Sequence, residues 1–163
     1  MNQLPELAAR LLAGCEAGGI RIMLAESLTG GLLADAIISV PGASRVVLGS
    51  IVAYDNSVKS GVLGVPRQLL REFGAVSSQC AEAMAAGARN LIAAEGFRVF
   101  AVSTTGVAGP DSQEGKPVGQ VHLAVAGPNG VSSRAMQFYG DRTQIRQQAV
   151  ASAIEVLLEE ITQ

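Results

Sequence analysis

Histidine, cysteine, tryptophan and charged residues are all scarce in this sequence of 163 residues. It contains one His, two Cys and no Trp, and only 16% of its residues are charged. Cys15 and Cys80 form no metal-binding or redox motif, and we expect both to be buried thiols. One His and scattered carboxylates give no spacing typical of a metal site, so we expect chemistry that needs no metal and no other cofactor.

Clusters of basic residues and long apolar runs are also missing. The sequence has 12 Lys and Arg against 14 Asp and Glu, which gives a net charge of −2, and its basic residues form no run. Both features argue against nucleic-acid binding. The apolar runs fall far short of the roughly 18 residues that a membrane span needs. The N-terminus lacks a signal-peptide pattern, so we expect a cytoplasmic protein without a membrane partner. The low charge content leaves little charged surface for a monomer and favours a homodimer.

Hydrophobic residues make up 48% of the sequence, which is enough for one folded domain over residues 1–163. Their spacing predicts helices at 4–17, from 31 to about 41, at 56–63, from 66, at 77–94 and at 141–161, and strands at 20–25, 45–54, 97–103, 118–126 and 131–138. This order predicts a three-layer α/β/α sandwich, in which a final hairpin makes a mostly parallel sheet mixed. Ligands usually bind at the carboxyl ends of such strands, which points to segments 25–31, 54–59 and 103–119.

Ser27 follows the first expected strand and precedes Gly30, Gly31 and a helix. The backbone N–H groups at a helix N-terminus are free, and the helix dipole adds partial positive charge there. Such a turn suits a nucleophile beside an oxyanion or phosphate site. The hexapeptide alone leaves a second interpretation open, in which Ser27 or Thr29 merely caps the helix.

A serine nucleophile needs a base, and the sequence offers few. His122 lies inside an expected strand, where a structural role fits better. Ten of the 12 basic residues are Arg, which stays protonated. Lys59 follows the strand at 45–54 and could lie near Ser27 with a pKa lowered by burial, while Tyr54 could orient or relay a proton. A solvated Lys59 and a packing Tyr54 remain the alternative.

Two further segments could contact a substrate. Thr104 and Thr105 carry hydroxyl groups after a buried strand, and the glycines that follow, beginning with Gly106, let the backbone come close to a ligand. The segment contains neither a Walker-type phosphate loop nor a dinucleotide fingerprint, and it could be a plain surface loop. Arg142 lies in the first turn of the last helix, where the dipole disfavours a cation, so it could bind a phosphate or simply be solvated.

The segments AESLTGG, YDNSVK, TTGVAGPD and GDR, in this order, resemble the CinA C-terminal family over residues 4–159. Stand-alone members of that family are nicotinamide mononucleotide amidohydrolases, usually dimeric. The resemblance therefore implies a three-layer fold and hydrolysis of the carboxamide to nicotinate mononucleotide and ammonia, in pyridine nucleotide salvage. It implies that Ser27 is the nucleophile, that Lys59 is the base and that Tyr54 assists it. The residues implied in substrate binding are Thr29, Gly30, Gly31, Asn56, Thr105, Gly106 and Arg142.

Two segments depart from the family pattern. Leu28 stands beside Ser27 where the family usually has cysteine, which changes the pocket wall. Residues 111–115 read DSQEG where members commonly have Asp-Gly-Gly, so we expect a stiffer loop. Two other functions stay open on these grounds: a catalytically silent nucleotide-binding paralogue, and an interaction protein associated with competence or DNA damage.

Overall fold

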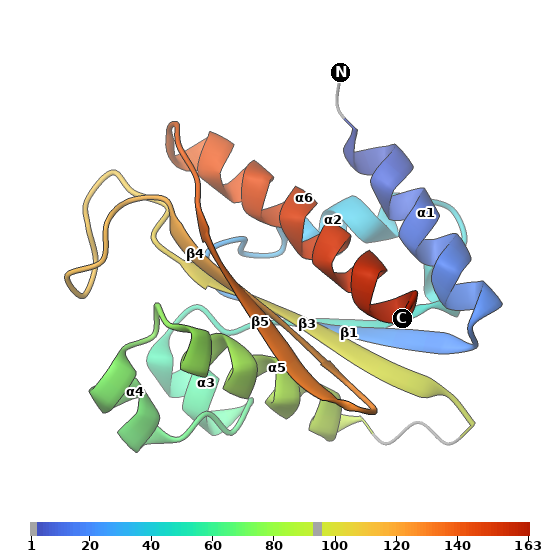
Figure 1. Cartoon of the computed structure of the whole chain (residues 1–163), viewed down its shortest axis with the longest axis horizontal. Coiled ribbons are helices and arrows are strands. Elements are labelled where there is room, and N and C mark those ends of the chain that lie inside the picture. The colour runs from blue at the N-terminus through green and yellow to red at the C-terminus, as the bar shows by residue number, and fades with distance from the viewer. Residues whose placement is uncertain (1–2, 93–95) are drawn as a thin grey trace.

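A five-stranded sheet forms the middle layer of the protein, described here from a computed structural model for residues 3–92 and 96–163 (Figure 1). In spatial order its strands are β2 (Val47–Val52), β1 (Ile20–Glu26), β3 (Arg98–Gly106), β4 (Gln120–Gly127) and β5 (Gly130–Gln137). β1 pairs in parallel with both β2 and β3, whereas β3–β4 and β4–β5 are antiparallel. The predicted mixed sheet is therefore confirmed.

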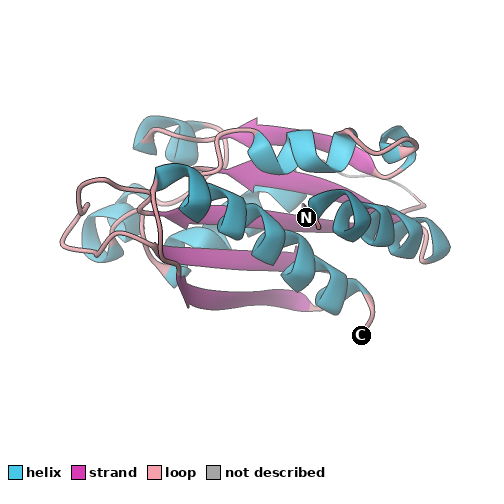
Figure 2. Cartoon of the chain, turned by 90° about the horizontal axis from the view of Figure 1, so that it is seen from above, coloured by secondary structure: helices cyan, strands magenta, loops and turns pink. Residues whose placement is uncertain are grey.

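Helices cover both faces of the sheet, which confirms the predicted three layers (Figures 1 and 2). On one face lie α1 (Leu4–Ala17), α2 (Leu32–Ile38) and α6 (Arg142–Ile161), and on the other lie α3 (Asn56–Gly61), α4 (Arg67–Phe73) and α5 (Ser78–Leu91). Alternate residues of each strand point to opposite faces, so Ile22 and Leu24 pack under α1, α2 and α6, whereas Met23 packs toward α5. Among the described residues, no helix is both long and apolar enough to cross a membrane.

Several predicted boundaries differ from the observed ones. β3 continues past its predicted end at residue 103 to Gly106, because Thr104 and Thr105 pair with β4. Residues 43–45 form a 3₁₀ turn (η1), so β2 begins only at Val47. Pro66 is the N-cap of α4 rather than its first residue. The predicted end of the long helix at Ala94 lies outside the described residues.

Two predicted helix starts are confirmed. The Ser77 side chain accepts a hydrogen bond from the backbone N–H of Cys80, and the Asp141 side chain accepts one from that of Gln144. The Gln144 side chain in turn accepts a hydrogen bond from the backbone N–H of Asp141, which completes a capping box at the start of α6. These caps fix where α5 and α6 begin, close to the carboxyl ends of β1, β2 and β3.

Candidate active site

Ser27 lies where the chain leaves β1, and it is 8% exposed. Its backbone N–H donates to the carbonyl oxygen of Thr104 at 3.0 Å, which ties it to the neighbouring strand. A cavity of about 140 Å³ adjoins it. The cavity is lined by Ser27, Leu28, Tyr54, Asn56, Lys59, Ala75, Val76, residues 105–109, Asp111, Gln113 and Arg142. Segments expected at the carboxyl ends of three strands therefore meet in one place.

Lys59 is almost completely buried, at 1% exposure, and its amino group reaches Ser27. The short helix α3 starts after Asp55, whose side chain accepts from the backbone N–H of Ser57, and this start turns Lys59 inward. Lys59 Nζ lies 3.1 Å from Ser27 Oγ, 2.9 Å from the carbonyl oxygen of Ala53 and 3.1 Å from that of Tyr54. A hydroxyl nucleophile and an amine are thus within hydrogen-bond reach.

The protonation state of Lys59 decides what this contact can do. Burial lowers the pKa of Lys59, while Cys80, Asp55 and Glu114 act in the opposite direction. A neutral amine has two N–H groups and one lone pair. If the two N–H groups donate to the carbonyls of Ala53 and Tyr54, the lone pair faces the Ser27 hydroxyl. The geometry therefore suits proton transfer from Ser27 to Lys59.

Glu26, which the sequence analysis missed, is a fully buried carboxylate directly before Ser27. Five donors reach it: Thr29 Oγ1 at 2.7 Å, the backbone N–H groups of Gly31, Leu33 and Ala34 at 3.0 Å, and Ser50 Oγ at 2.9 Å. The N-cap residue of α2, Gly31, has no side chain of its own to accept these N–H groups. Glu26 therefore caps α2 from the end of β1, and it occupies the anion site expected at this helix N-terminus.

Thr29, Gly30 and Gly31 do not line the cavity, and substrate binding by these residues remains a prediction. The Thr29 hydroxyl is buried between Glu26 and Thr104 Oγ1. The Gly30 N–H donates to the carbonyl oxygen of Ser27, and that of Gly31 donates to Glu26. The two glycines supply positive φ angles of 57° and 98°, which the tight turn after Ser27 requires.

Tyr54 and Arg142 lie at the mouth of the cavity. Tyr54 is 62% exposed, and its hydroxyl accepts from Arg142 Nη2 at 3.2 Å. Arg142 Nη1 also donates to the carbonyl oxygen of Gly109 at 2.7 Å. Tyr54 contacts Lys59 through its backbone carbonyl only, so the structure shows no hydrogen bond that would let its hydroxyl relay a proton. Asn56 is exposed and lines the same mouth.

Thr105 and Gly106 form the wall contributed by β3. The Thr105 hydroxyl donates to the carbonyl oxygen of Ala75 at 2.7 Å, so it can act toward a ligand only as an acceptor. A Cβ at Gly106 would lie 2.7 Å from the carbonyl oxygen of Gln120, which explains the glycine. His122 is hydrogen-bonded to Ser78 and Gln120 and does not line the cavity, in agreement with a structural role.

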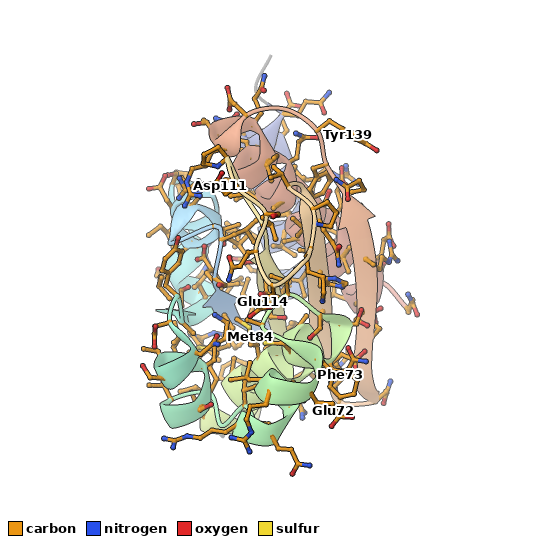
Figure 3. The ribbon with its side chains drawn as sticks, turned by 90° about the vertical axis from the view of Figure 1, so that its left-hand side faces the viewer. Glu72, Phe73, Met84, Asp111, Glu114 and Tyr139 are labelled. Atoms are coloured by element: carbon orange, nitrogen blue, oxygen red, sulfur yellow. The ribbon has the colours of Figure 1, made fainter. Side chains whose placement is uncertain are left out.

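The loop between β3 and β4 lies across this end of the sheet (Figure 3). The Glu114 carboxylate accepts from the backbone N–H groups of Ala75 and Val76, each at 3.2 Å. Lys116 Nζ donates to the carbonyl oxygen of Val76 at 2.7 Å. Two side chains of opposite charge thus bind the loop to the segment between α4 and α5. Asp111 and Gln113 of the same loop line the cavity.

Neither cysteine belongs to this site. Cys15 and Cys80 are buried as predicted, and burial raises the pKa of Cys15 to about 12 and that of Cys80 to about 11. Within residues 3–92 and 96–163, no three or more His, Cys, Asp or Glu side chains come together to hold a metal ion.

A larger hollow of about 630 Å³ lies elsewhere, against α1 and α6. Its lining includes Glu6, Arg10, Tyr139 and several glutamines, but no serine, cysteine or lysine. Because covalent catalysis needs an activated nucleophile, the smaller cavity at Ser27 is the better candidate for chemistry.

Comparisons with known proteins agree with the architecture. The CinA C-terminal domain family matches residues 4–161. A CinA-like protein from Frankia casuarinae is 48% identical over 136 residues, which are 83% of this chain and 30% of that protein. One from Anaeromyxobacter sp. (strain K) is 46% identical over 157 residues, which are 96% of this chain and 37% of that protein. The chain therefore spans about a third of the length of these curated relatives.

Solved structures give the same result. The crystal structure of competence/damage inducible protein CihA from Agrobacterium tumefaciens has a TM-score of 0.90 at 41% identity, and the match covers 100% of this chain and 98% of that one. A competence-damaged protein (CinA) superfamily protein from Escherichia coli has a TM-score of 0.92 at 29% identity, covering 98% and 91%.

Proposed function

Because this chain belongs to the CinA C-terminal domain family, we propose that it hydrolyses the carboxamide of nicotinamide mononucleotide to nicotinate mononucleotide and ammonia. The observation that carries the proposal is the 3.1 Å contact between Ser27 Oγ and the buried amino group of Lys59. A serine with a desolvated amine beside it suits attack on a carboxamide carbon.

The reaction starts with the neutral amine of Lys59. Its lone pair accepts the proton of Ser27 as Oγ attacks the carboxamide carbon, and the carbonyl oxygen becomes an oxyanion. The resulting ammonium of Lys59 is stabilised by the carbonyl oxygens of Ala53 and Tyr54, which remain its acceptors. The base is thus held in one orientation in both protonation states.

The tetrahedral intermediate then collapses. Its C–N bond breaks, the Lys59 ammonium returns its proton to the departing nitrogen, and ammonia leaves behind an acyl ester on Ser27. Water enters, Lys59 takes one of its protons, and the hydroxide adds to the ester carbon. When the C–O bond to Ser27 breaks, Oγ recovers its proton from Lys59, and the carboxylic acid that forms loses its remaining proton to water and leaves as the carboxylate.

The size of the cavity favours binding of the pyridine ring inside it and of the ribose and phosphate at its mouth. At about 140 Å³ it is smaller than the roughly 300–1,000 Å³ of pockets that enclose whole drug-sized ligands, so it suits the pyridine ring rather than a complete nucleotide. Ribose and phosphate then extend to the mouth, where Arg142 offers a guanidinium group and Asn56 an amide. The Tyr54 hydroxyl belongs with this binding group.

Ammonia release from nicotinamide mononucleotide by the purified protein, in the presence of EDTA, tests the proposal. Ser27→Ala and Lys59→Met should abolish release, whereas Ser44→Ala, at an exposed serine far from the cavity, should leave it unchanged. Release that persists in Ser27→Ala would refute the nucleophile. Tight binding of the nucleotide without any release would identify a silent binding paralogue.

A further inference from the structure

Side chains on two sides hold the turn that carries Ser27 by hydrogen bonds to its backbone and to the start of α2. Glu26 accepts hydrogen bonds on the side facing α2. On the other side, Arg146 reaches across from α6 and binds two consecutive carbonyl oxygens. Its Nε donates to Leu28 at 2.8 Å and its Nη2 to Thr29 at 2.9 Å. Neither the mechanism above nor the sequence motifs give Arg146 a role.

The backbone N–H groups of this turn are not equally free. The N–H groups of Ser27, Gly30 and Gly31 donate to Thr104, Ser27 and Glu26, respectively. Those of Leu28 and Thr29 donate to no atom in the part of the chain that the structure describes. Leu28 itself lines the cavity beside Ser27. The donors left for an oxyanion are therefore the amides of Leu28 and Thr29, rather than those of the two glycines.

Each of these two amides belongs to a peptide group whose carbonyl oxygen is held. The Leu28 amide shares a planar peptide with the carbonyl of Ser27, which accepts from Gly30. The Thr29 amide shares one with the carbonyl of Leu28, which accepts from Arg146. Because a trans peptide points its N–H opposite to its C=O, the guanidinium group fixes the direction of the Thr29 N–H. Its charge also polarises that peptide and makes the N–H a stronger donor.

We propose that Arg146 is a positioning residue that orients the amide of Thr29 as an oxyanion donor of the Ser27 reaction, beside the amide of Leu28. The inference rests on the proposed function. Two features of the chain fit it. The planar guanidinium group donates to the two carbonyls from two separate nitrogens, Nε and Nη2, that are held in one rigid plane. Gly30 leaves room for it, since a Cβ there would come within 3.3 Å of Arg146 Nη2.

The same helix offers a matched comparison. Arg142 lies one helical turn before Arg146, but its guanidinium group points to the cavity mouth, where it binds Tyr54 and the carbonyl oxygen of Gly109. Loss of Arg142 should weaken nucleotide binding and raise KM. Loss of Arg146 should lower kcat and leave KM nearly unchanged, because its contacts are to the turn and not to the ligand.

The experiment uses a fluorophosphonate probe, which phosphonylates reactive serines and places its P=O oxygen where the oxyanion would form, together with steady-state ammonia release. We expect the wild type to be labelled at Ser27 and Arg146→Lys and Arg146→Met to be labelled more slowly. Loss of one oxyanion donor costs about 100- to 1,000-fold in kcat in other hydrolases, so a misoriented donor should lower labelling and kcat by about 10- to 100-fold. Arg134→Lys, at an exposed arginine of β5 that does not line the cavity, should label like the wild type. Methylguanidinium should restore part of the rate to Arg146→Ala.

The results separate the two proposals. If the wild type is labelled and both Arg146→Lys and Arg146→Met react at its rate, the inference is overturned while the nucleophile stands. A rise in KM without a fall in kcat would also overturn it, since Arg146 would then be a binding residue. If the wild type neither labels at Ser27 nor releases ammonia, the proposed function fails and the inference falls with it. Should Arg146→Met fail to fold, Arg146→Lys, which keeps the charge but lacks the planar guanidinium group, is the variant that tests the inference.

Discussion

The substitution Glu26→Gln should destabilise the protein by about 3 kcal/mol, because an amide can accept hydrogen bonds at only one of its two polar atoms. If nitrogen replaces Oε1, the backbone N–H of Ala34 loses its acceptor, although the Ser50 hydroxyl can turn. If it replaces Oε2, Gly31 and Leu33 lose theirs. Each buried N–H left unsatisfied costs about 1–3 kcal/mol, and the surviving bonds lose their charged acceptor.

Urea unfolding followed by circular dichroism measures the change in free energy of unfolding, and thermal unfolding followed by the same signal measures the melting temperature. For a chain of this length, 1 kcal/mol corresponds to about 2–4 °C in melting temperature, so we expect a fall of about 6–12 °C. Glu72→Gln is the matched control, since Glu72 is exposed on α4 (Figure 3) and the change should stay within about 0.5 kcal/mol. Equal stability of Glu26→Gln and wild type would refute the assignment of Glu26 as the buried cap of α2.

Further predictions concern activity and assembly. Because burial lowers the pKa of Lys59 and only the neutral amine accepts a proton, kcat/KM should rise with pH through an inflection below the ordinary lysine value; a pH profile without such a limb would contradict the base. Tyr54→Phe should raise KM several-fold and leave kcat within about threefold, since its hydroxyl contacts Arg142 and not Lys59, and a large fall in kcat would restore a proton relay. Glu114→Ala should raise KM and accelerate hydrogen exchange of the two amides that Glu114 binds, and unchanged exchange would show that the loop is held by other contacts. The edge strand β2 carries no charged residue, so we expect a homodimer by light scattering; a monomer would remove that expectation.

Periodicity and topology accounted for most of the fold and for the centre of the site. The alternation of helices and strands predicts three layers, and the rule that parallel strands end at one edge brings Ser27 and Lys59 near each other. The same rule cannot show that α3 turns the Lys59 side chain inward by way of its cap at Asp55. That detail depends on local hydrogen bonds which appear only in three dimensions.

The residues that sequence reasoning missed act over long distances or through the backbone. Arg146 binds carbonyls that lie 117 and 118 residues earlier in the chain, and no spacing rule predicts such a contact. Glu26 ends a buried strand, and an acidic residue in that place is the one signal that could have pointed to a cap for the helix after it. The glycines and proline that follow Thr104 and Thr105 favour a loop, yet threonine is also a good strand residue, and β4 pairs with both.

The contacts that hold the nucleophile and its base are made largely to main-chain atoms. Lys59 is oriented by the carbonyls of Ala53 and Tyr54, and Arg146 binds those of Leu28 and Thr29. Every amino acid supplies a carbonyl, so side chains at these positions can be exchanged without removing the acceptors. The walls of the cavity can therefore be altered to admit a different amide while the reacting groups keep their geometry, which makes the domain a promising scaffold for redesigned amidases.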